Sequence, residues 1–314
     1  MLIVNRLKNM IAKIKVENIY NHIRLTFIAV CMALLFFGCE RDANVDVPLS
    51  KAKLVMRSFI SPTDSVIAVD IFASQPLFNS SQQNNKFDTA AAQVFISNGS
   101  VEFTLIYNST KRQFQINVLQ AFPVTAGQTY FLRATHPSYD AVDASCTVPV
   151  STIDNVKATV DITDPYEVFA DVSFFDIAGQ KNYYRVHAQN VWIPDFGYFG
   201  VDTVVYADFL LSINNFYSDE GNDGKEIKSK LLNYYSYHPG DSTDIYVLNV
   251  DENYYRFHRS VFTTGGGDPF SEATPAYSNI NNGVGIFAAY TQFRKRVFWY
   301  YFRIIKFIFA KKIK

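Results

Sequence analysis

The sequence has few of the residues that build a disulfide framework or a zinc site. It contains 3 cysteines and 5 histidines among 314 residues. Two of the cysteines lie in or directly after an apolar segment near the N-terminus, which leaves Cys146 alone in the body and excludes a disulfide framework there. No two histidines lie within five residues of each other, so the spacing of a zinc site is missing. We interpret Cys146 as a small buried side chain.

An apolar run long enough to span a bilayer is also missing near the N-terminus. Residues 25–38 form an uncharged run of 14 residues, whereas a membrane span needs about 20. The run follows a basic flank that ends at Arg24, and its last glycine stands directly before Cys39. This pattern predicts a signal peptide over residues 1–38 and resembles a bacterial lipobox, with Cys39 as the lipidated residue and residues 39–51 as a tether. The alternatives are an uncleaved anchor or a secretory peptide cut elsewhere.

The sequence has no net charge, because 29 basic and 29 acidic residues cancel. The charges are nevertheless unevenly distributed. Residues 292–314 contain eight basic and no acidic residues, while residues 40–291 contain 16 basic and 28 acidic residues. Nucleic-acid binding rests on basic side chains that neutralise phosphates, so this acidic body argues against it.

Aromatic residues are abundant, with 28 Phe and 20 Tyr, as is typical of β-sheets. Seven segments of alternating polar and apolar residues lie between residues 52 and 149, and turn residues separate them. A mainly β fold follows, with an N-terminal antiparallel β-sandwich of immunoglobulin-like or transthyretin-like type. Asn98 and Gly99 predict a tight turn in it.

Residues 150–291 predict a second β-rich domain with one or two short helices. Four of its segments alternate as strands do, at 156–162, 169–177, 182–193 and 203–213. Residues 224–237 fit a strand pair and a short helix equally well. Asp251 is expected to cap a helix that follows a strand. We expect residues 149–155 to link the two domains.

A loop rich in aromatic residues is the first candidate binding site. Large rings on a loop interrupted by Pro and Gly have no periodic core to fill, and aromatic side chains are enriched at binding surfaces. The alternative is that the loop folds back onto its own sandwich. The candidate residues are Trp192, Phe196, Tyr198 and Phe199.

An acidic turn with Asp219, Glu220 and Asp223 is the second candidate, as a surface for a partner of opposite charge. Its composition suggests a calcium loop, but Lys230 stands where a bidentate glutamate should close the site. We therefore expect no metal and no cofactor. No nucleophile motif is present either, so we expect no enzyme activity.

Residues 292–314 mix basic and aromatic side chains and form the least interpretable segment. Two interpretations stand: a tail that lies in the interface of an anionic membrane, or a divergent C-terminus that replaces the last strand.

Several segments together resemble the domain-of-unknown-function family numbered 4249 of Bacteroidota lipoproteins. Beside the lipobox they are residues 126–130, 183–186, 216–220, 254–257 and 283–287. The resemblance covers residues 40–290. It implies an outer-membrane lipoprotein, often encoded beside a TonB-dependent transporter, and no known enzyme activity.

The expected function is therefore that of a non-enzymatic, lipid-anchored outer-membrane protein on the periplasmic or cell-surface face. Its expected partners are the membrane and a TonB-dependent nutrient transporter. The alternative is a surface adhesin that binds glycans or proteins, and a more remote one is a secreted hydrolase.

The lipobox predicts that Cys39 carries the membrane anchor. Replacing it (Cys39→Ala) should abolish incorporation of labelled palmitate and release the protein from the outer-membrane fraction, because acyl chains hold such proteins to the bilayer. Cys146→Ala is the control and should keep both properties. A Cys39→Ala protein that still fractionates wholly with membranes, beside a wild type without label, would contradict the prediction.

Overall fold

The computed structural model describes most of the chain after residue 50 and a short helical stretch near the N-terminus. Contacts within the chain divide it into two units, residues 1–49 and residues 50–314. The described residues are 24–28, 32, 51–75, 87–118, 122–150, 153, 155–161, 167–192, 205–210, 213–234, 242–264 and 275–299. Among these, no helix is both long and apolar enough to cross a membrane.

The predicted N-terminal sandwich is confirmed. Its strands are β1 (Leu54–Ile60), β2 (Val66–Ala73), β3 (Gln93–Ser97), β4 (Glu102–Thr104), β5 (Ile106–Asn108), β6 (Gln113–Asn117), β7 (Thr129–His136) and β8 (Tyr139–Thr147), with a short 3-10 helix at Thr89–Ala91. Strands β1, β2, β6 and β5 adjoin in one sheet, and β4, β3, β7 and β8 form another. All seven predicted segments contain strands.

One predicted segment, residues 101–109, contributes to both sheets. Its first part is β4, which pairs with β3, and its second part is β5, which pairs with β6. Leu105 lies between them, with its side chain buried and its N–H donating to the carbonyl of Val94 at 2.9 Å. The chain therefore crosses from one sheet to the other at this residue. The predicted turn at Gly99 is also present, with a φ of 88°.

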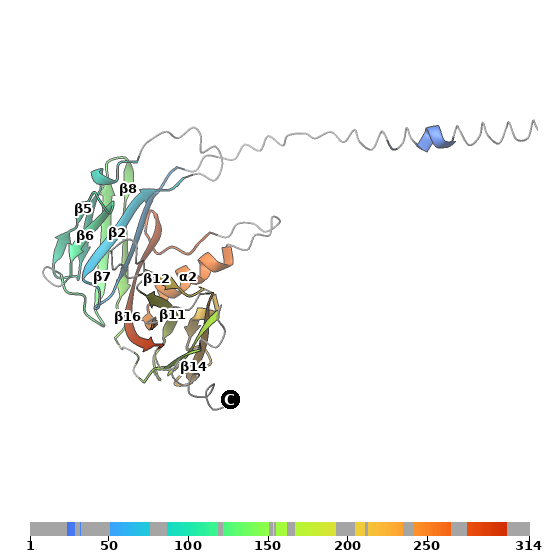
Figure 1. Ribbon diagram of the computed structural model, residues 1–314. Helices are drawn as coiled ribbons and strands as arrows, with labels where there is room; N and C mark the ends of the chain where they lie inside the picture. The colour runs from blue at the N-terminus through green and yellow to red at the C-terminus, as the bar shows by residue number, and fades with distance from the viewer. Residues whose placement is uncertain are drawn as a thin grey trace, which may run out of the picture. The chain divides into compact units, whose positions relative to one another are not determined.

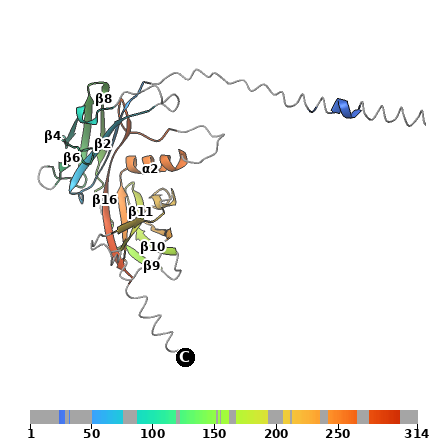
Figure 2. The same cartoon turned by 45° about the horizontal axis from the view of Figure 1, so that its top comes forward.

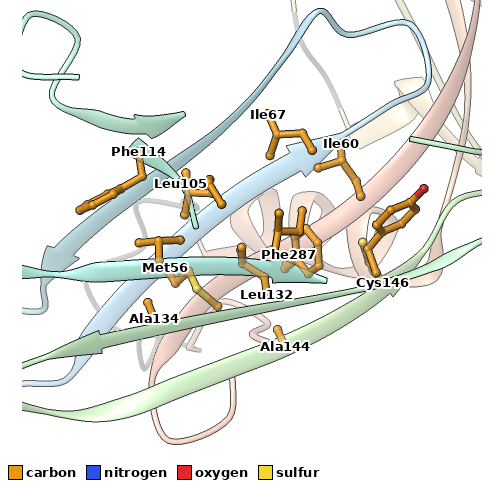
Figure 3. Close-up of a cluster of buried hydrophobic side chains, with 14 of the residues drawn as sticks. Met56, Ile60, Ile67, Leu105, Phe114, Leu132, Ala134, Ala144, Cys146 and Phe287 are labelled. Carbon is orange, nitrogen blue, oxygen red and sulfur yellow. The ribbon is translucent and has the colours of Figure 1, made fainter. Parts of the chain in front are cut away.

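Alternate side chains of the two sheets form the core of this sandwich. Met56 and Ile60 from β1 meet Leu132 and Ala134 from β7, and Phe287 from the far end of the chain joins them (Figure 3). Each of these side chains has no exposed surface. The period of two in the sequence thus corresponds to one buried face on each strand.

The second group of strands is also mainly β, as predicted. Its elements are β9 (Lys157–Asp161), β10 (Glu167–Phe175), β11 (Tyr183–Trp192), β12 (Val205–Asp208), a 3-10 helix at Ile213–Asn215, β13 (Phe216–Ser218), β14 (Glu226–Tyr234), β15 (Ser242–Val250), the helix α2 (Glu252–Thr264) and β16 (Val284–Phe298). Residues 224–237 fitted a strand pair or a helix; the described part of this range, up to residue 234, contains the strand β14, whose alternate side chains are buried.

Strand β16 connects the two groups of strands. Its first part pairs in parallel with β1, from Val284 to Ala289, and its second part pairs antiparallel with β15, from Tyr290 to Phe298. Within the described residues one sheet therefore runs in the order β12-β11-β15-β16-β1-β2-β6-β5, with β13 also on β11 (Figure 1). The sheet β14-β10-β9 packs against the part of this long sheet that strands β11, β15 and β16 form. The two predicted domains share β16, and how independently they fold stays a prediction.

Residues 292–298, which we assigned to the tail, belong to β16. Phe293 and Val297 pack against the second core, and Trp299 is buried, with its indole N–H donating to Thr243 at 3.0 Å. Arg294 and Arg296 stand at outward positions of the strand, whereas Lys295 shares the face of Phe293 and Val297 and thereby interrupts the alternation in the sequence. The assignment of a tail from residue 292 is therefore wrong up to Trp299, and residues 300–314 lie outside the described residues.

Helix α2 covers the outer face of the long sheet beside β16 and β11 (Figure 2). Asp251 caps it as predicted, since its carboxylate accepts the N–H of Tyr254 at 2.8 Å. The apolar side of the helix, with Tyr254 and Phe257, packs against Phe59 of β1 and Ile286 of β16 in a third core.

Two glycines allow the close approach of β16 to β1. A Cβ at Gly283 would lie 2.6 Å from the carbonyl oxygen of Leu54. A Cβ at Gly285 would overlap the carbonyl oxygen of Met56, and the φ of Gly285 is 124°, which L side chains rarely adopt. The junction between the two groups of strands therefore requires glycine at both positions.

Replacing Gly285 by alanine should destabilise the protein by at least about 3 kcal/mol, because strain and a backbone clash add. Gly179→Ala is the control: its φ is also positive, at 80°, but a Cβ there would meet nothing within 4 Å. It should cost only about 1 kcal/mol. Chemical denaturation of the full chain measures both, and equal costs would contradict the importance of the β16–β1 approach.

Candidate functional site

The outer face of the second group of strands carries a row of polar and aromatic side chains. On β11, Tyr184, Val186 and Ala188 point into the second core, so Arg185, His187 and Gln189 face outward. The registers place Arg185 opposite Leu248, and His187 opposite Tyr246, on β15. Side chains that are two residues apart on one strand thus line up with those of the next strand.

A pocket of about 480 Å³ opens on this face beside helix α2. Its lining combines residues from β1, β11, β12, β15, β16 and α2. Volumes of this order are typical of sites for small molecules. We take this pocket as the candidate functional site.

Arg185 lies at the α2 end of the pocket. Its Nη1 donates to the hydroxyl of Tyr254, and its guanidinium lies 5.6 Å from the ring centre of Phe216 and 5.9 Å from that of Tyr254. Its Nε is buried and has no hydrogen-bond partner. Among the described residues no carboxylate forms an ion pair with Arg185, so its charge is held by rings and a hydroxyl alone.

Two histidines in the pocket are neutral at physiological pH. Burial lowers the pKa of His187 to about 4, and the nearby charge of Arg185 lowers it further while Asp208 opposes this. Burial also lowers the pKa of His258 to about 4. Arg185 is therefore the cation of this end of the pocket.

Stacked rings form the floor and one wall of the pocket. His187 stacks on Tyr246, with ring centres 4.5 Å apart and planes within 5° of parallel. On the α2 side, His258 stacks on Tyr254 at 4.2 Å, and Phe59 contacts both at 5.2 to 5.4 Å. Such packing restricts the motion of these side chains and holds the wall in one conformation.

The far end of the pocket offers hydrogen-bond acceptors. The side-chain amide of Gln189 donates to one carboxylate oxygen of Asp208 at 2.7 Å, on the edge strand β12. Asp208 is exposed, and the carbonyl oxygen of Gln189 and the second oxygen of Asp208 remain as acceptors. At the side wall the hydroxyl of Tyr290 donates to Asp64 at 3.1 Å.

An ion triad with a buried carboxylate and two partly exposed arginines borders the pocket beyond Tyr246. The side chain of Asp244 is fully buried and accepts from Arg294 at 2.6 Å and from Arg296 at 2.7 Å. Burial by itself would raise the pKa of Asp244, but the hydrogen bonds from Arg296 and Arg294 outweigh it and hold the pKa below its usual value. The triad ties β15 to β16 through two basic residues of the segment we had assigned to the tail.

The aromatic loop predicted from the sequence lies largely outside the described residues. Trp192 is the last residue of β11, while Phe196, Tyr198 and Phe199 fall in the undescribed segment that follows. Cys39 is outside the described residues as well. Binding by this loop and lipidation of Cys39 stay predictions.

Two of the three residues of the acidic turn have structural hydrogen bonds. Asp219 accepts the N–H of Asn182 at 3.0 Å, and Asp223 accepts the N–H of Gly179 at 2.8 Å. Glu220 is exposed. These bonds hold the turn to the segment before β11. In the described part of the chain no group of three His, Cys, Asp or Glu side chains is placed to hold a metal ion.

Cys146 is buried in the first core, and burial raises the pKa of its thiol well above the usual value.

The pocket itself was not predicted from the sequence. The signal that could have indicated it is the outward set of the strand at 182–193, where Arg185, His187 and Gln189 alternate with core residues.

The comparison with protein families decides the affiliation of the chain. The family described as "Domain of unknown function (DUF4249)" matches residues 40–296. The chain belongs to this family. The match ends within β16 and includes every residue that lines the pocket, so the pocket is built wholly from the region that matches the DUF4249 family.

Comparisons beyond the DUF4249 family give little more. No curated protein matches the chain. Among solved structures, a two-domain fibronectin type III segment of chicken tenascin is 15% identical, covers 64% of this chain and 91% of its own, and has a TM-score of 0.21. Chicken CNTN1 FN1–FN3 domains are 12% identical, with 62% of this chain and 63% of that chain covered and a TM-score of 0.21. Neither similarity supports a function.

Replacing Asp244 by asparagine should destabilise the protein at pH 7 by about 2 kcal/mol, since two charged hydrogen bonds weaken while both arginines stay partly solvated. A lowered pKa means that the carboxylate stabilises the fold above its usual pKa of 3.8 and that this contribution is lost as the pH falls through the lower, folded value. The difference between variant and wild type should therefore shrink below about pH 4.

Asp140→Asn is the control, because its pair with Lys51 has 72% and 76% of the two side chains exposed. It should cost less than about 0.5 kcal/mol at any pH. Denaturation midpoints between pH 3 and pH 8 test both variants. A cost for Asp244→Asn that does not depend on pH would contradict the role of the ionised carboxylate.

Proposed function

We propose that the protein is a lipid-anchored binding protein of the outer membrane that acts as an accessory of a TonB-dependent nutrient transporter. The observation that carries the binding role is the pocket on the outer face of the long sheet. Its lining comes from five strands and one helix, and its aromatic and polar side chains are held by ring stacking and hydrogen bonds. A site on such rigid elements is suited to select a ligand.

The anchor in this proposal is lipid on Cys39. It is supported by the basic flank, the uncharged run of residues 25–38 and the cysteine directly after a glycine. In this proposal residues 39–51 are the tether predicted from the sequence, which connects the lipid to the first strand. This arrangement would hold the pocket close to the membrane that contains the transporter.

The transporter as partner is supported by the family resemblance alone, and in this proposal the protein is not an enzyme. Its task is to hold a nutrient near the transporter or to contact the transporter directly. An adhesin that binds glycans or proteins is the competing function.

Affinity purification from the native outer membrane tests the proposal. The full-length, tagged protein, crosslinked before detergent extraction, should co-purify with a TonB-dependent β-barrel in near-stoichiometric amount. Cys39→Ala should lose the barrel, because the protein leaves the membrane. Absence of any barrel, together with wild-type binding to host or surface glycans on an array, would overturn the proposal in favour of the adhesin.

A further inference from the structure

The charge of Arg185 is the least compensated feature of the pocket. Burial of a cation costs free energy unless an anion or a full set of hydrogen-bond acceptors offsets it. Arg185 has one hydroxyl acceptor, Tyr254, and no carboxylate partner among the described residues. Its Nε is buried and unpaired. Arg294 and Arg296 lie on the same face of the sheet, and both form ion pairs with the carboxylate of Asp244. Their positive charges are therefore compensated by a carboxylate, in contrast to that of Arg185.

The surroundings of Arg185 do not replace the missing anion. His187 and His258 are neutral at physiological pH, and Phe216 offers the guanidinium only its ring. Asp64 is turned to the hydroxyl of Tyr290. The planar fork of a guanidinium matches the oxygens of a carboxylate or a phosphate, and the single uncompensated charge of Arg185 corresponds to the one negative charge of a carboxylate rather than the larger charge of a phosphate.

The opposite end of the pocket has the opposite character. Asp208 and the carbonyl oxygen of Gln189 accept hydrogen bonds there. Arg185 and Gln189 are four residues apart on β11, which corresponds to about 13 Å along a strand. The two ends of the pocket therefore differ in character. A cation lies at the α2 end and hydrogen-bond acceptors lie at the edge strand, with the stacked rings of His187 and Tyr246 between them.

We propose that this pocket binds a small organic acid, with its carboxylate on Arg185 and its hydroxyl or amino groups on Gln189 and Asp208. The rings of His187 and Tyr246 contact the body of the ligand. A volume of about 480 Å³ lies within the range typical of pockets for small organic ligands. This inference rests on the proposed binding function and names its ligand class.

Calorimetric titration of the full chain with two matched pairs of probes tests the ligand class. The first pair is a galacturonic acid trimer and the neutral galactose trimer. The second is a tripeptide with a free C-terminus and the same tripeptide amidated. At least one acidic probe should bind, and its neutral counterpart should bind about 10- to 100-fold more weakly, the range expected for loss of a charged hydrogen-bonded pair. The pair that binds identifies the acid as a sugar or a peptide.

Arg185→Gln should lower the affinity for the acidic probe by the same factor and leave the affinity for the neutral probe unchanged. Arg185→Lys, which keeps the charge without the fork, should bind with intermediate affinity and serves if the glutamine variant does not fold. Arg133→Gln is the matched control, because Arg133 is an exposed arginine of the first sandwich paired with Glu102. It should bind as the wild type does.

Thermal unfolding without ligand separates a binding role from a structural one. Arg185→Gln should melt within about 2 °C of the wild type, because it removes an uncompensated charge together with a few weak contacts. A large loss of stability with unchanged binding would overturn the proposal. Equal affinity for acidic and neutral probes, or no binding of either acidic probe at millimolar concentration, would also overturn it.

Co-purification of the β-barrel with the Arg185→Gln protein keeps this inference separate from the proposed function. If the wild type co-purifies with the barrel but does not prefer acidic probes over neutral ones, the ligand class alone is overturned. Loss of the barrel in the wild type would overturn the transporter role, whichever probe binds.

Discussion

The remaining described elements are arranged around the close approach of β16 to β1. Parallel pairing from Val284 to Ala289 requires the backbone of β16 to pass the carbonyl oxygens of Leu54 and Met56, and a side chain at Gly283 or Gly285 would prevent it. The same strand then pairs with β15 over its remaining length. One long strand thereby contributes to three cores: the first part of β16 faces the first sandwich on one side and helix α2 on the other, and its second part faces the second sandwich.

The pocket is a consequence of this shared sheet. Helix α2 has to cover the apolar outer side chains near the β16–β1 junction, such as Ile286 and Phe59, and it is only 13 residues long. In the part of the sheet that the helix does not cover, the outward side chains of β11 and β15 are polar or aromatic. Arg185 and Tyr246 are held there by strands whose opposite side chains are fully buried, so the pocket has a rigid base that a loop could not provide.

Charge is used in three different ways on this chain. Asp219 and Asp223 accept backbone N–H groups and hold a turn, so their acidity has a local structural use. Asp244 is buried and is compensated by two arginines. Arg185 is the remaining case, because rings and a hydroxyl hold it without an anion. The contrast between the compensated and the uncompensated cations on the same face is what directs attention to a carboxylate ligand.

The sequence was enough to identify the strands, since alternation with a period of two is a local property that one buried face imposes on each strand. It also determined the cap of α2 at Asp251 and the turn at Gly99, which depend on residues a few positions apart. The pairing partners depended on the tertiary structure: a segment with eight basic residues gave no sign that its first part pairs with β15, because Lys295 shares the face of Phe293 and Val297 and breaks the alternation. The pocket required the fold for the same reason, since Arg185 and Tyr254 are 69 residues apart and meet only when β16 brings the helix onto the sheet.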